Sequence, residues 1–572
     1  MVRAYIGMSG FTAGRHFTLP SVRFHLVPLM IILAFALLVS GKLFTPKFYT
    51  SHDGEGHVIR MEEFHNALVD GQFPVRLTRQ INYGLGYPFF NFNYPFIYYL
   101  GEIFHLTGLS FVSSFKAVMI VSVLLGGVGM YIWTLSHFGR LGAVTSSIFF
   151  MLAPYRFLNI YVRGNVAETF ALSLIPLVLY AVERLMARLP GSKGLLSLSL
   201  TILLLSHNIT AVIGLTLTGS YFLFLLKYSK AKLPLVISAA KSVVTALLIS
   251  MYFWLPLVIE TGLTRLVELT GDYKYFFPTL AEVIYSPWGF GPYKQGISPG
   301  KMSPQIGLIH QLVAGLSLVL ITTRYLRGKT LKPSDKFLLF FLGVALISIF
   351  LSLPDSQFLW ETVSIIKFVQ IPWRFIGYVS LGLAIAAGYV VAALKTKTLQ
   401  AAVFIGLIIL LTYANRNHIR VNQYVDYVSP LSGATVYGPS TTSKDEHMPK
   451  WAPRIYSAPN PDGDVLAPAG GKSARLVWKS NYHLFDVTAS DSGGFRDNTS
   501  YFPGWEAKVD GRGQPIEYQA DAFGRLLVYL PAGTHQVEYF FRETPYRLLS
   551  DFVSIITLAT VLLVVWWRRG LW

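Results

Sequence analysis

Long apolar runs separated by short polar segments constrain this chain more than any other feature. Several of the runs approach the roughly 20 residues that an α-helix needs to cross a bilayer. Of the 572 residues, 53% are hydrophobic and 14% are charged, whereas about 25% of the residues in a soluble domain are charged. The sequence therefore predicts an α-helical, multi-pass membrane protein.

The charge balance and the absence of cysteine narrow the function further. The net charge of +18 could indicate nucleic-acid binding. Many of the basic residues lie between apolar runs, however, so cytoplasmic loops and anionic lipid explain them better, and we expect no nucleic-acid partner. A chain without cysteine has no disulfides, thiolate zinc sites or cysteine nucleophiles.

The N-terminal region predicts an uncleaved first span. Arg3, Arg15 and Arg23 precede a long apolar run that lacks a small-residue cleavage site. We expect this basic leader to be cytoplasmic and the loop 42–110 to lie outside the membrane.

The segment 94–109 decides the predicted topology. It is short and aromatic and contains Glu102 and His105, so it is interpreted as interfacial or re-entrant. With this segment outside, most bases between later spans fall on the cytoplasmic side, as the positive-inside rule requires. About twelve spans follow, with both termini cytoplasmic: 26–40, 113–136, 141–154, 168–183, 195–206, 209–226, 234–258, 304–323, 337–353, 373–394, 399–414 and 549–567.

Two later segments are expected on the outer side of the cytoplasmic membrane. The loop 260–303 is rich in Tyr, Pro and Gly and is long enough to be a lid. Strand-like runs at 474–478 and 526–530, with turn signals at 461–463, 510–511 and 531–533, predict a β-sandwich. The predicted domains are a transmembrane domain at 1–413, an external β-rich domain at 414–545, and a final helix with a basic tail at 546–572.

The first external loop contains the strongest candidate site. It contains His52-Asp53-Gly54-Glu55-Gly56-His57. A partly desolvated carboxylate near a membrane can act as a general base. Alternatively, the two acids cap a helix that starts near His57, or the two histidines and two acids bind a divalent metal such as Mg²⁺ or Mn²⁺. Residues 58–69 have the pattern of a short helix on the membrane surface.

Three further elements bring polar residues to the same predicted face. Arg163, Asn165 and Glu168 follow the span that ends at Pro154, His207-Asn208 links two spans, and Arg374 opens another. Arginine suits phosphate because its guanidinium donates paired hydrogen bonds and stays charged. The alternative for each arginine is an interaction with lipid headgroups.

The chain resembles the GT-C class of membrane glycosyltransferases, and more specifically bacterial and archaeal membrane proteins labelled 6-pyruvoyl-tetrahydropterin-synthase-related. The similarity spans nearly the whole chain. The matching motifs are His52-Asp53 with His57 and Arg60, Pro74 with Arg76, Gly84 to Pro88, Arg163-Gly164 with Glu168, Ser206 to Asn208, Pro372 to Phe375, Asp445 to Pro449, and Tyr501 to Trp505.

The resemblance implies an inverting transferase that uses a polyprenyl-phosphate-linked sugar and a glycan, lipid or protein acceptor outside the cytoplasmic membrane. Asp53 would be the general base, Glu55 would assist it or hold a metal, and Glu168 would be a second outer acid. Arg163, Arg374 and His207 would bind phosphate. The other substrate-binding candidates are His52, His57, Arg60, Arg76 and Asn208. Many members of the class need no metal, so none is required here.

Two other functions remain open from the sequence. A flippase for lipid-linked sugars should show broken helices at matching positions and ionisable residues in mid-span. A non-catalytic envelope-assembly protein would use its external β domain instead. The grouping of polar residues at span ends favours the transferase.

Overall fold

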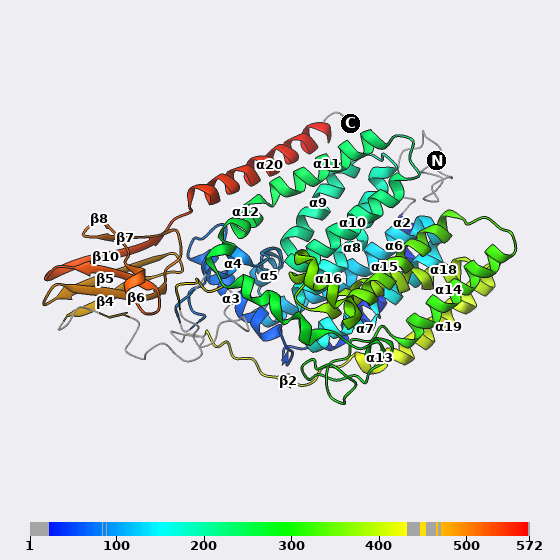
Figure 1. The fold of residues 1–572 in the computed structure, drawn as a ribbon, viewed down its shortest axis with the longest axis horizontal. Helices are drawn as coiled ribbons and strands as arrows, with labels where there is room; N and C mark the ends of the chain where they lie inside the picture. The colour runs from blue at the N-terminus through cyan, green and yellow to red at the C-terminus, as the bar shows by residue number, and fades with distance from the viewer. Residues whose placement is uncertain are drawn as a thin grey trace. The chain divides into compact units, whose positions relative to one another are not determined.

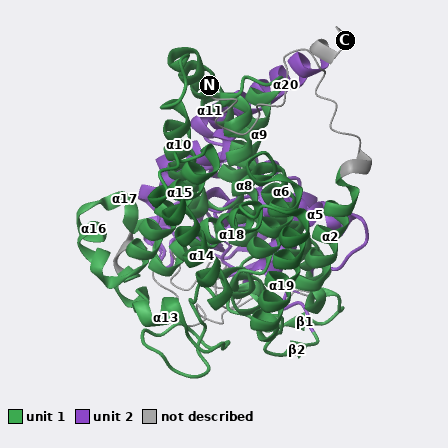
Figure 2. Ribbon diagram, turned by 90° about the vertical axis from the view of Figure 1, so that its right-hand side faces the viewer, with its two compact units in different colours: residues 1–55, 112–246, 271–426 green, residues 56–111, 247–270, 427–572 purple. Residues whose placement is uncertain are grey.

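The computed structural model describes residues 22–82, 84–86, 88–431, 447–452, 465–466 and 471–569 (Figure 1). Arg3 and Arg15 of the leader, Tyr87, the pair Asp445-Glu446 and the predicted turn at 461–463 lie outside the described residues. Contacts divide the chain into two compact units (Figure 2). Unit 1 comprises residues 1–55, 112–246 and 271–426, and unit 2 comprises 56–111, 247–270 and 427–572. The predicted domain boundaries after residues 413 and 545 stay predictions.

Unit 1 is a helical body. Its long helices are α2 (Val22–Val39), α6 (Phe111–Met151), α8 (Val166–Met186), α9 (Ser192–Ser206), α10 (Asn208–Leu226), α11 (Lys232–Ile249), α14 (Leu308–Leu326), α15 (Pro333–Ser352), α18 (Ile376–Ala392) and α19 (Lys397–Asn415). The short elements used below are α7 (Pro154–Phe157), η2 (Leu158–Arg163), α13 (Leu280–Ile284) and η6 (Pro372–Phe375). A two-stranded ribbon joins β1 (Phe48–Tyr49) to β2 (Tyr424–Val425).

The multi-pass expectation is confirmed. Among the described residues, nine helices are long and apolar enough to cross a membrane, and three shorter apolar helices lie at His25–Val39, Ser192–Ser206 and Met251–Leu263. Eleven predicted spans each overlap one helix, two of them α6, whereas 234–258 covers both α11 and a separate helix, Met251–Glu260. The number of crossings and the sides of the loops stay predictions.

Helix α6 accounts for two of the predicted spans. Its 41 residues would extend about 60 Å if straight, twice the thickness of the hydrocarbon core. The non-helical Gly139, with φ 67° and ψ −177°, interrupts it. A Cβ atom on Gly126 would lie 3.0 Å from the ring of Phe150. Two positions on opposite sides of Gly139 can meet in this way only if the helix folds back on itself.

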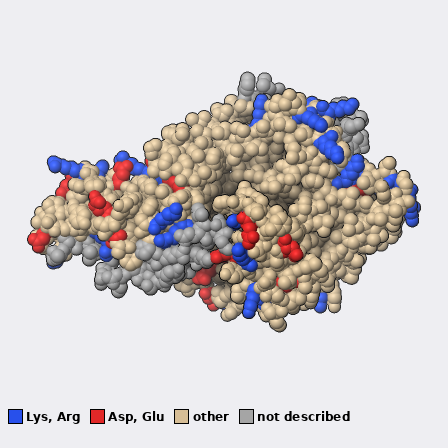
Figure 3. Space-filling model, viewed as in Figure 1, with Lys and Arg blue, Asp and Glu red and all other residues tan. Residues whose placement is uncertain are grey.

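Burial separates the centre of unit 1 from its rim. In the apolar stretches of α8 and α18, 89% and 94% of the residues are buried, against 17% in α11 and in α19. In Figure 3 the surface over the long helices is almost without charged residues, and Lys and Arg gather where these helices end. A bilayer requires this pattern, because its core does not solvate charge.

Unit 2 combines short helices with a β-sandwich. Its helices are α3 (Gly54–Val69, which starts in unit 1), α4 (Phe89–Phe92), α5 (Phe96–Leu106), α12 (Met251–Glu260) and α20 (Pro545–Arg569). With 11 residues, α5 is about 16 Å long and too short to cross a bilayer. This length supports the interfacial interpretation of 94–109.

The expectation for residues 58–69 needs correction. The helix α3 begins at Gly54, before His57. The apolar side chains Val58 and Phe64 are fully buried, and Phe64 packs on Phe90 and Tyr98. The apolar face of α3 therefore covers protein, because an amphipathic pattern does not distinguish lipid from a protein neighbour.

The predicted β-sandwich is present in the described part of the C-terminal region. Its strands are β3 (Val465–Leu466), β4 (Lys472–Trp478), β5 (Tyr482–Ala489), β6 (Gly493–Ser500), β7 (Trp505–Val509), β8 (Arg512–Gln514), β9 (Arg525–Leu530) and β10 (Gly533–Phe541). They form an antiparallel five-stranded sheet, β4-β5-β10-β7-β8, and a three-stranded sheet, β3-β6-β9. Phe485, Phe495 and Tyr539 from both sheets meet in the core, as alternating strands predict.

Candidate active site around Asp53

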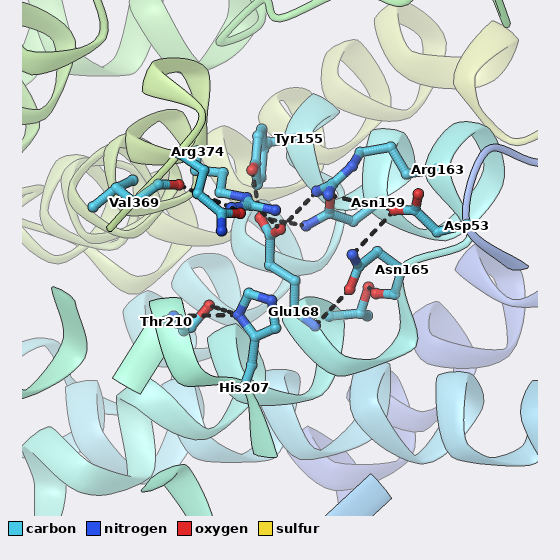
Figure 4. Close-up of polar contacts among 12 residues, drawn as sticks. Asp53, Tyr155, Asn159, Arg163, Asn165, Glu168, His207, Thr210, Val369 and Arg374 are labelled. Carbon is cyan, nitrogen blue, oxygen red and sulfur yellow. Dashed lines mark hydrogen bonds and ion pairs between the residues drawn. The ribbon is translucent and has the colours of Figure 1, made fainter. Parts of the chain in front are cut away.

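The candidate site lies where several elements of unit 1 begin or end. Asp53 precedes α3, Arg163 ends η2, Glu168 lies in the first turn of α8, His207 links α9 to α10, and Arg374 lies in η6 before α18 (Figure 4). The helices α8, α10 and α18 run from this end to segments rich in bases. Those bases are Arg184, Arg188, Lys193, Lys227, Lys230, Lys232, Lys395 and Lys397. The site and the basic segments thus occupy opposite ends of these helices.

Backbone hydrogen bonds fix the position of Asp53. The amides of His52 and Asp53 donate to the carbonyl oxygens of Val162 and Arg163, at 3.1 and 2.6 Å. This close approach requires Gly164, which has φ +66°. A Cβ atom there would lie 2.4 Å from Ser51 Oγ and 3.0 Å from the backbone of Gly54.

The element that presents Arg163 is a single stretch of π-helix. In η2 (Leu158–Arg163) the chain winds wider than an α-helix, and such segments occur frequently at functional sites. All six side chains of η2 are buried. The guanidinium of Arg163 lies 4.8 Å from the ring centre of Trp373, which holds it from one side.

The carboxylate of Asp53 is held on one side and open on the other. Its Oδ2 accepts from Asn165 Nδ2 at 3.1 Å and lies 3.5 Å from Arg163 Nη2. Within the described part of the chain, Oδ1 has no hydrogen-bond partner. The side chain is 38% exposed, so the carboxylate is accessible from outside the network.

Glu168 is buried beneath this surface and surrounded by donors. Its carboxylate accepts from Arg163 Nη1 at 2.6 Å, from the Tyr155 hydroxyl at 2.5 Å and from Asn159 Nδ2 at 3.2 Å. Its Oε2 also lies 3.5 Å from Arg374 Nε. A carboxylate satisfied in this way holds two guanidinium groups in place, and this geometry favours a positioning role over the catalytic role implied by the resemblance.

The two arginines differ in the donors that they leave open. Arg163 donates to Asn159 and Glu168, and it pairs with Asp53. Burial alone would lower the pKa of Arg163, but Glu168 and Asp53 outweigh burial and raise that pKa above its usual range.

Arg374 donates through Nη1 to the carbonyl of Val369 at 2.8 Å and lies 3.4 Å from Gln370 Oε1. Its buried Nε has no hydrogen-bond partner, and no bond from Nη2 to a described residue exists. Because Nε faces Glu168 Oε2 at 3.5 Å, Nη2 is the donor of Arg374 that remains for an anion. Arg163 uses Nη1 for Asn159 and Glu168, and its Nη2 faces Asp53.

His207 has a structural contact at the same level. Its Nδ1 accepts from the amide of Thr210 at 3.2 Å and lies 2.8 Å from the Thr210 hydroxyl, so it caps α10. Burial lowers the pKa of His207 to about 3, and the imidazole is neutral at physiological pH. A neutral capping imidazole does not supply the phosphate-binding charge expected of it. Asn208, the first residue of α10, is half-buried beside it.

Glu55 and His52 lie at the rim of the site. Glu55 is exposed in the first turn of α3 and makes no contact with a described residue. His52 is also exposed, and its Nε2 donates to the carbonyl of Phe290 at 2.7 Å. The loop that was expected to be a lid is thereby tied to the segment before α3.

That loop is held internally as well. Glu282 and Lys301 form a buried ion pair, and Glu282 also accepts from the backbone of Thr279 and Gly296. The amide of Gly291 donates to the carbonyl of Gly300 at 2.7 Å. These contacts favour a fixed wall beside Asp53 over a mobile lid.

Three predicted site residues belong to unit 2 and have partners there. His57 Nδ1 lies 3.2 Å from the Tyr98 hydroxyl, and the guanidinium of Arg60 lies 4.6 Å from the ring centre of Phe89.

Buried Arg76 pairs with Glu543 at 3.0 Å and with Asp551 at 2.9 Å, and it donates to the carbonyl of Tyr252. It ties the start of α20 to the loop after α3. Because these acids occupy its donors, Arg76 is better described as a structural residue than as a substrate ligand.

The sequence leaves open a metal site at His52, Asp53, Glu55 and His57, and the described part of the chain gives it no support. There, no group of three or more His, Asp or Glu has the arrangement of a metal site. Sequence reasoning also missed two polar ligands of Glu168, Asn159 and Tyr155. The four-residue spacing of Asn159 and Arg163 places both on one face of a helical turn and could have indicated the first.

The comparisons with known proteins give one family and several distant structures. Residues 90–419 match the family described as "6-pyruvoyl-tetrahydropterin synthase related domain; membrane protein". No curated protein matches the sequence. The solved structures include arabinofuranosyltransferase AftD from Mycobacteria, with 12% identity and a TM-score of 0.40 over 70% of this chain and 27% of that one.

Two other solved structures have similar scores. ArnT from Cupriavidus metallidurans, bound to undecaprenyl phosphate, has 15% identity and a TM-score of 0.41, over 67% of this chain and 63% of that one. The Archaeoglobus fulgidus oligosaccharyltransferase has 13% identity and a TM-score of 0.37, over 71% of this chain and 56% of that one. The chain thus spans less than two thirds of the length of each, and similarity at this level assigns neither activity nor substrate.

Proposed function

We propose that this chain, which belongs to the 6-pyruvoyl-tetrahydropterin synthase related family of membrane proteins, is an inverting glycosyltransferase. Its donor would be a sugar linked to a polyprenyl phosphate, and its acceptor a hydroxyl of a glycan, lipid or protein outside the cytoplasmic membrane. One observation carries the proposal. A partly exposed carboxylate with an open oxygen, Asp53, and a guanidinium with an open Nη2, Arg374, belong to one polar network at the ends of apolar helices.

Asp53 is the proposed catalytic base. Its open Oδ1 would accept the proton of the acceptor hydroxyl. The hydroxyl oxygen forms a bond to the anomeric carbon while the bond from that carbon to the phosphate oxygen breaks. The electron pair of that bond leaves with the phosphate. A positioned base contributes about 10²–10⁴-fold to such a step.

Arg374 is the proposed ligand of the phosphate. Negative charge grows on the phosphate oxygen as the bond breaks, and a guanidinium held near that oxygen stabilises the charge. Glu168 contacts both Arg163 and Arg374 and would hold them in place. Glu55 is exposed beside the base and would contact the acceptor.

The location of the site supports a substrate that arrives from the membrane. The polyprenyl tail would stay among apolar helices such as α11 and α19, whose side chains are mostly exposed. Polar side chains gather at the ends of helices here, whereas a transporter would place them along its middle. This grouping favours chemistry at the membrane surface.

The test is sugar transfer by the purified protein in liposomes that contain a labelled polyprenyl-phosphate sugar and a hydroxylated acceptor. Movement of the labelled lipid between leaflets is measured in the same vesicles. We expect a glycosylated product with inverted anomeric configuration and no accelerated movement of the lipid. Accelerated movement without product would contradict the transferase and favour a flippase.

A further inference from the structure

We propose that Asn165 is a positioning residue for Asp53: it orients the carboxylate so that Oδ1 faces the acceptor. The inference rests on the transferase function proposed above and adds a residue to its machinery. Asn165 lies between η2 and α8, and its side chain points toward Asp53 (Figure 4).

The orientation of the Asn165 amide is fixed by helix capping. Its Oδ1 accepts from the backbone amide of Glu168 at 2.9 Å and so caps the N-terminus of α8. The NH₂ group must then point the other way, where it donates to Asp53 Oδ2 at 3.1 Å. The flipped amide would set donor against donor at Glu168 and oxygen against oxygen at Asp53.

The backbone of Asn165 is equally constrained. Its amide donates to the carbonyl of Asn159 at 3.0 Å, and its carbonyl accepts from the amide and the hydroxyl of Thr169 at 3.1 and 2.7 Å. The residue is 6% exposed. One asparagine thus joins the end of the π-helix, the start of α8 and the carboxylate of Asp53.

This arrangement makes the two oxygens of Asp53 unequal. Oδ2 is occupied by Asn165 and lies near Arg163, whereas Oδ1 faces no described donor. A base that is fixed by one oxygen presents the other in a defined direction, which is what a proton transfer needs. The charged and titratable groups near this carboxylate are its chain neighbours His52 and Glu55, its ion-pair partner Arg163, and the groups that interact with Arg163, namely Tyr155, Glu168, His207 and Arg374.

The decisive variant is Asn165→Asp. Aspartate caps a helix as well as asparagine does, so α8 should keep its start. The variant replaces the donor beside Asp53 Oδ2 by a second carboxylate. Because two carboxylates at this distance do not both ionise easily, transfer at neutral pH should fall by about tenfold or more and recover as the pH rises.

Two matched variants separate positioning from folding. Asn165→Ser keeps a capping oxygen but is too short to donate to Asp53, so it should lower kcat and leave KM for the donor nearly unchanged. Thr396→Ala removes the cap of α19, where the Thr396 hydroxyl accepts from the amide of Leu399 at 3.2 Å. It should lower the thermal midpoint and leave the pH profile of transfer unchanged.

A second measurement does not depend on transfer. Infrared titration follows the band of a protonated carboxyl group that disappears in Asp53→Asn. In Asn165→Asp this band should persist to higher pH than in the wild type. Suppose that the wild type transfers no sugar while the band of Asn165→Asp still persists to higher pH than that of the wild type. That pair of results would refute the proposed function and retain the contact between Asn165 and Asp53.

Two results would overturn the inference. The first is an Asn165→Asp protein whose pH profile of transfer and infrared titration match the wild type. The second is an Asn165→Ser protein with unchanged kcat.

Discussion

Glu168 shows how a single buried carboxylate organises the site. It contacts Arg163 and Arg374 and accepts from the Tyr155 hydroxyl. Burying an arginine without a counter-charge would cost several kcal/mol, so the carboxylate allows two cations to lie beside Asp53. In the proposed mechanism the two arginines differ in role: Arg163 holds the base Asp53, and Arg374 keeps Nη2 for the phosphate.

The first prediction separates these two arginines. Arg374→Lys keeps the charge but loses the planar fork, so KM for the polyprenyl-phosphate donor should rise about tenfold, with a small change in kcat. Arg163→Lys removes bonds to Asn159 and Glu168 and the stack on Trp373. It should destabilise the protein by about 3 kcal/mol. Donor-dependent kinetics and thermal unfolding check both variants.

An equal effect of the two substitutions on KM would contradict this assignment. If Arg374→Lys binds the donor as the wild type does, a group other than Arg374 binds the phosphate.

Sequence reasoning located these residues better than it assigned their roles. Asp53, Glu168 and Arg374 stand out because charge at the end of an apolar run is rare and costly. Their roles depend on which donors are already occupied, and that depends on contacts between distant segments. Arg76 illustrates the limit: its acidic partners lie more than 460 residues away, at Glu543 and Asp551.

Among the elements, η2 and the residue after it matter most. The π-helix ends at Arg163, and Gly164 turns the chain so that residues 51–54 dock on it. No periodicity in the sequence predicts one wide helical turn. The long helices were predictable because a bilayer selects for runs of about 20 apolar residues. The packing of α3 against protein was not predictable, because lipid and protein neighbours favour the same amphipathic pattern.

The second prediction concerns Gly164→Ala. A Cβ atom would lie 2.4 Å from Ser51 Oγ and 3.0 Å from the Gly54 backbone, at a residue with φ +66°. We expect displacement of Asp53 and a loss of transfer of more than about tenfold, since small misplacements of a base are costly. Transfer assays and thermal unfolding measure the two effects.

The matched control is Gly194→Ala in α9. Apart from its chain neighbours and the nearby backbone of α9, no described atom lies within 4 Å of the place that a Cβ atom would take there. Alanine should therefore stabilise the helix by up to about 1 kcal/mol. Full transfer activity in Gly164→Ala would show that this close approach does not position the base.

For the whole molecule, the opposed placement of the site and the basic segments predicts the topology. The ends of α8, α10 and α18 near Asp53 should face outward, and the ends rich in Lys and Arg should face the cytoplasm. The division into two units was not predictable, because each unit is assembled from three separate stretches of the chain. Contacts over such distances leave no local pattern in the sequence.

The third prediction tests this topology. The chain has no cysteine, so single cysteines can be placed at exposed Lys230, between α10 and α11, and at exposed Lys294, near Phe290. On intact cells, a membrane-impermeant maleimide should label Lys294→Cys and leave Lys230→Cys unlabelled until the membrane is opened. Labelling of both from one side would contradict the orientation.

The rate of sugar transfer by Asp53→Asn in liposomes tests most directly whether Asp53 is the catalytic base. Asparagine keeps the size of the side chain and can still accept from Asn165, so the fold and the thermal midpoint should be retained. Loss of the base should reduce kcat by about a hundredfold or more while the donor still binds. A folded Asp53→Asn protein that transfers sugar at the wild-type rate would show that Asp53 is not the catalytic base.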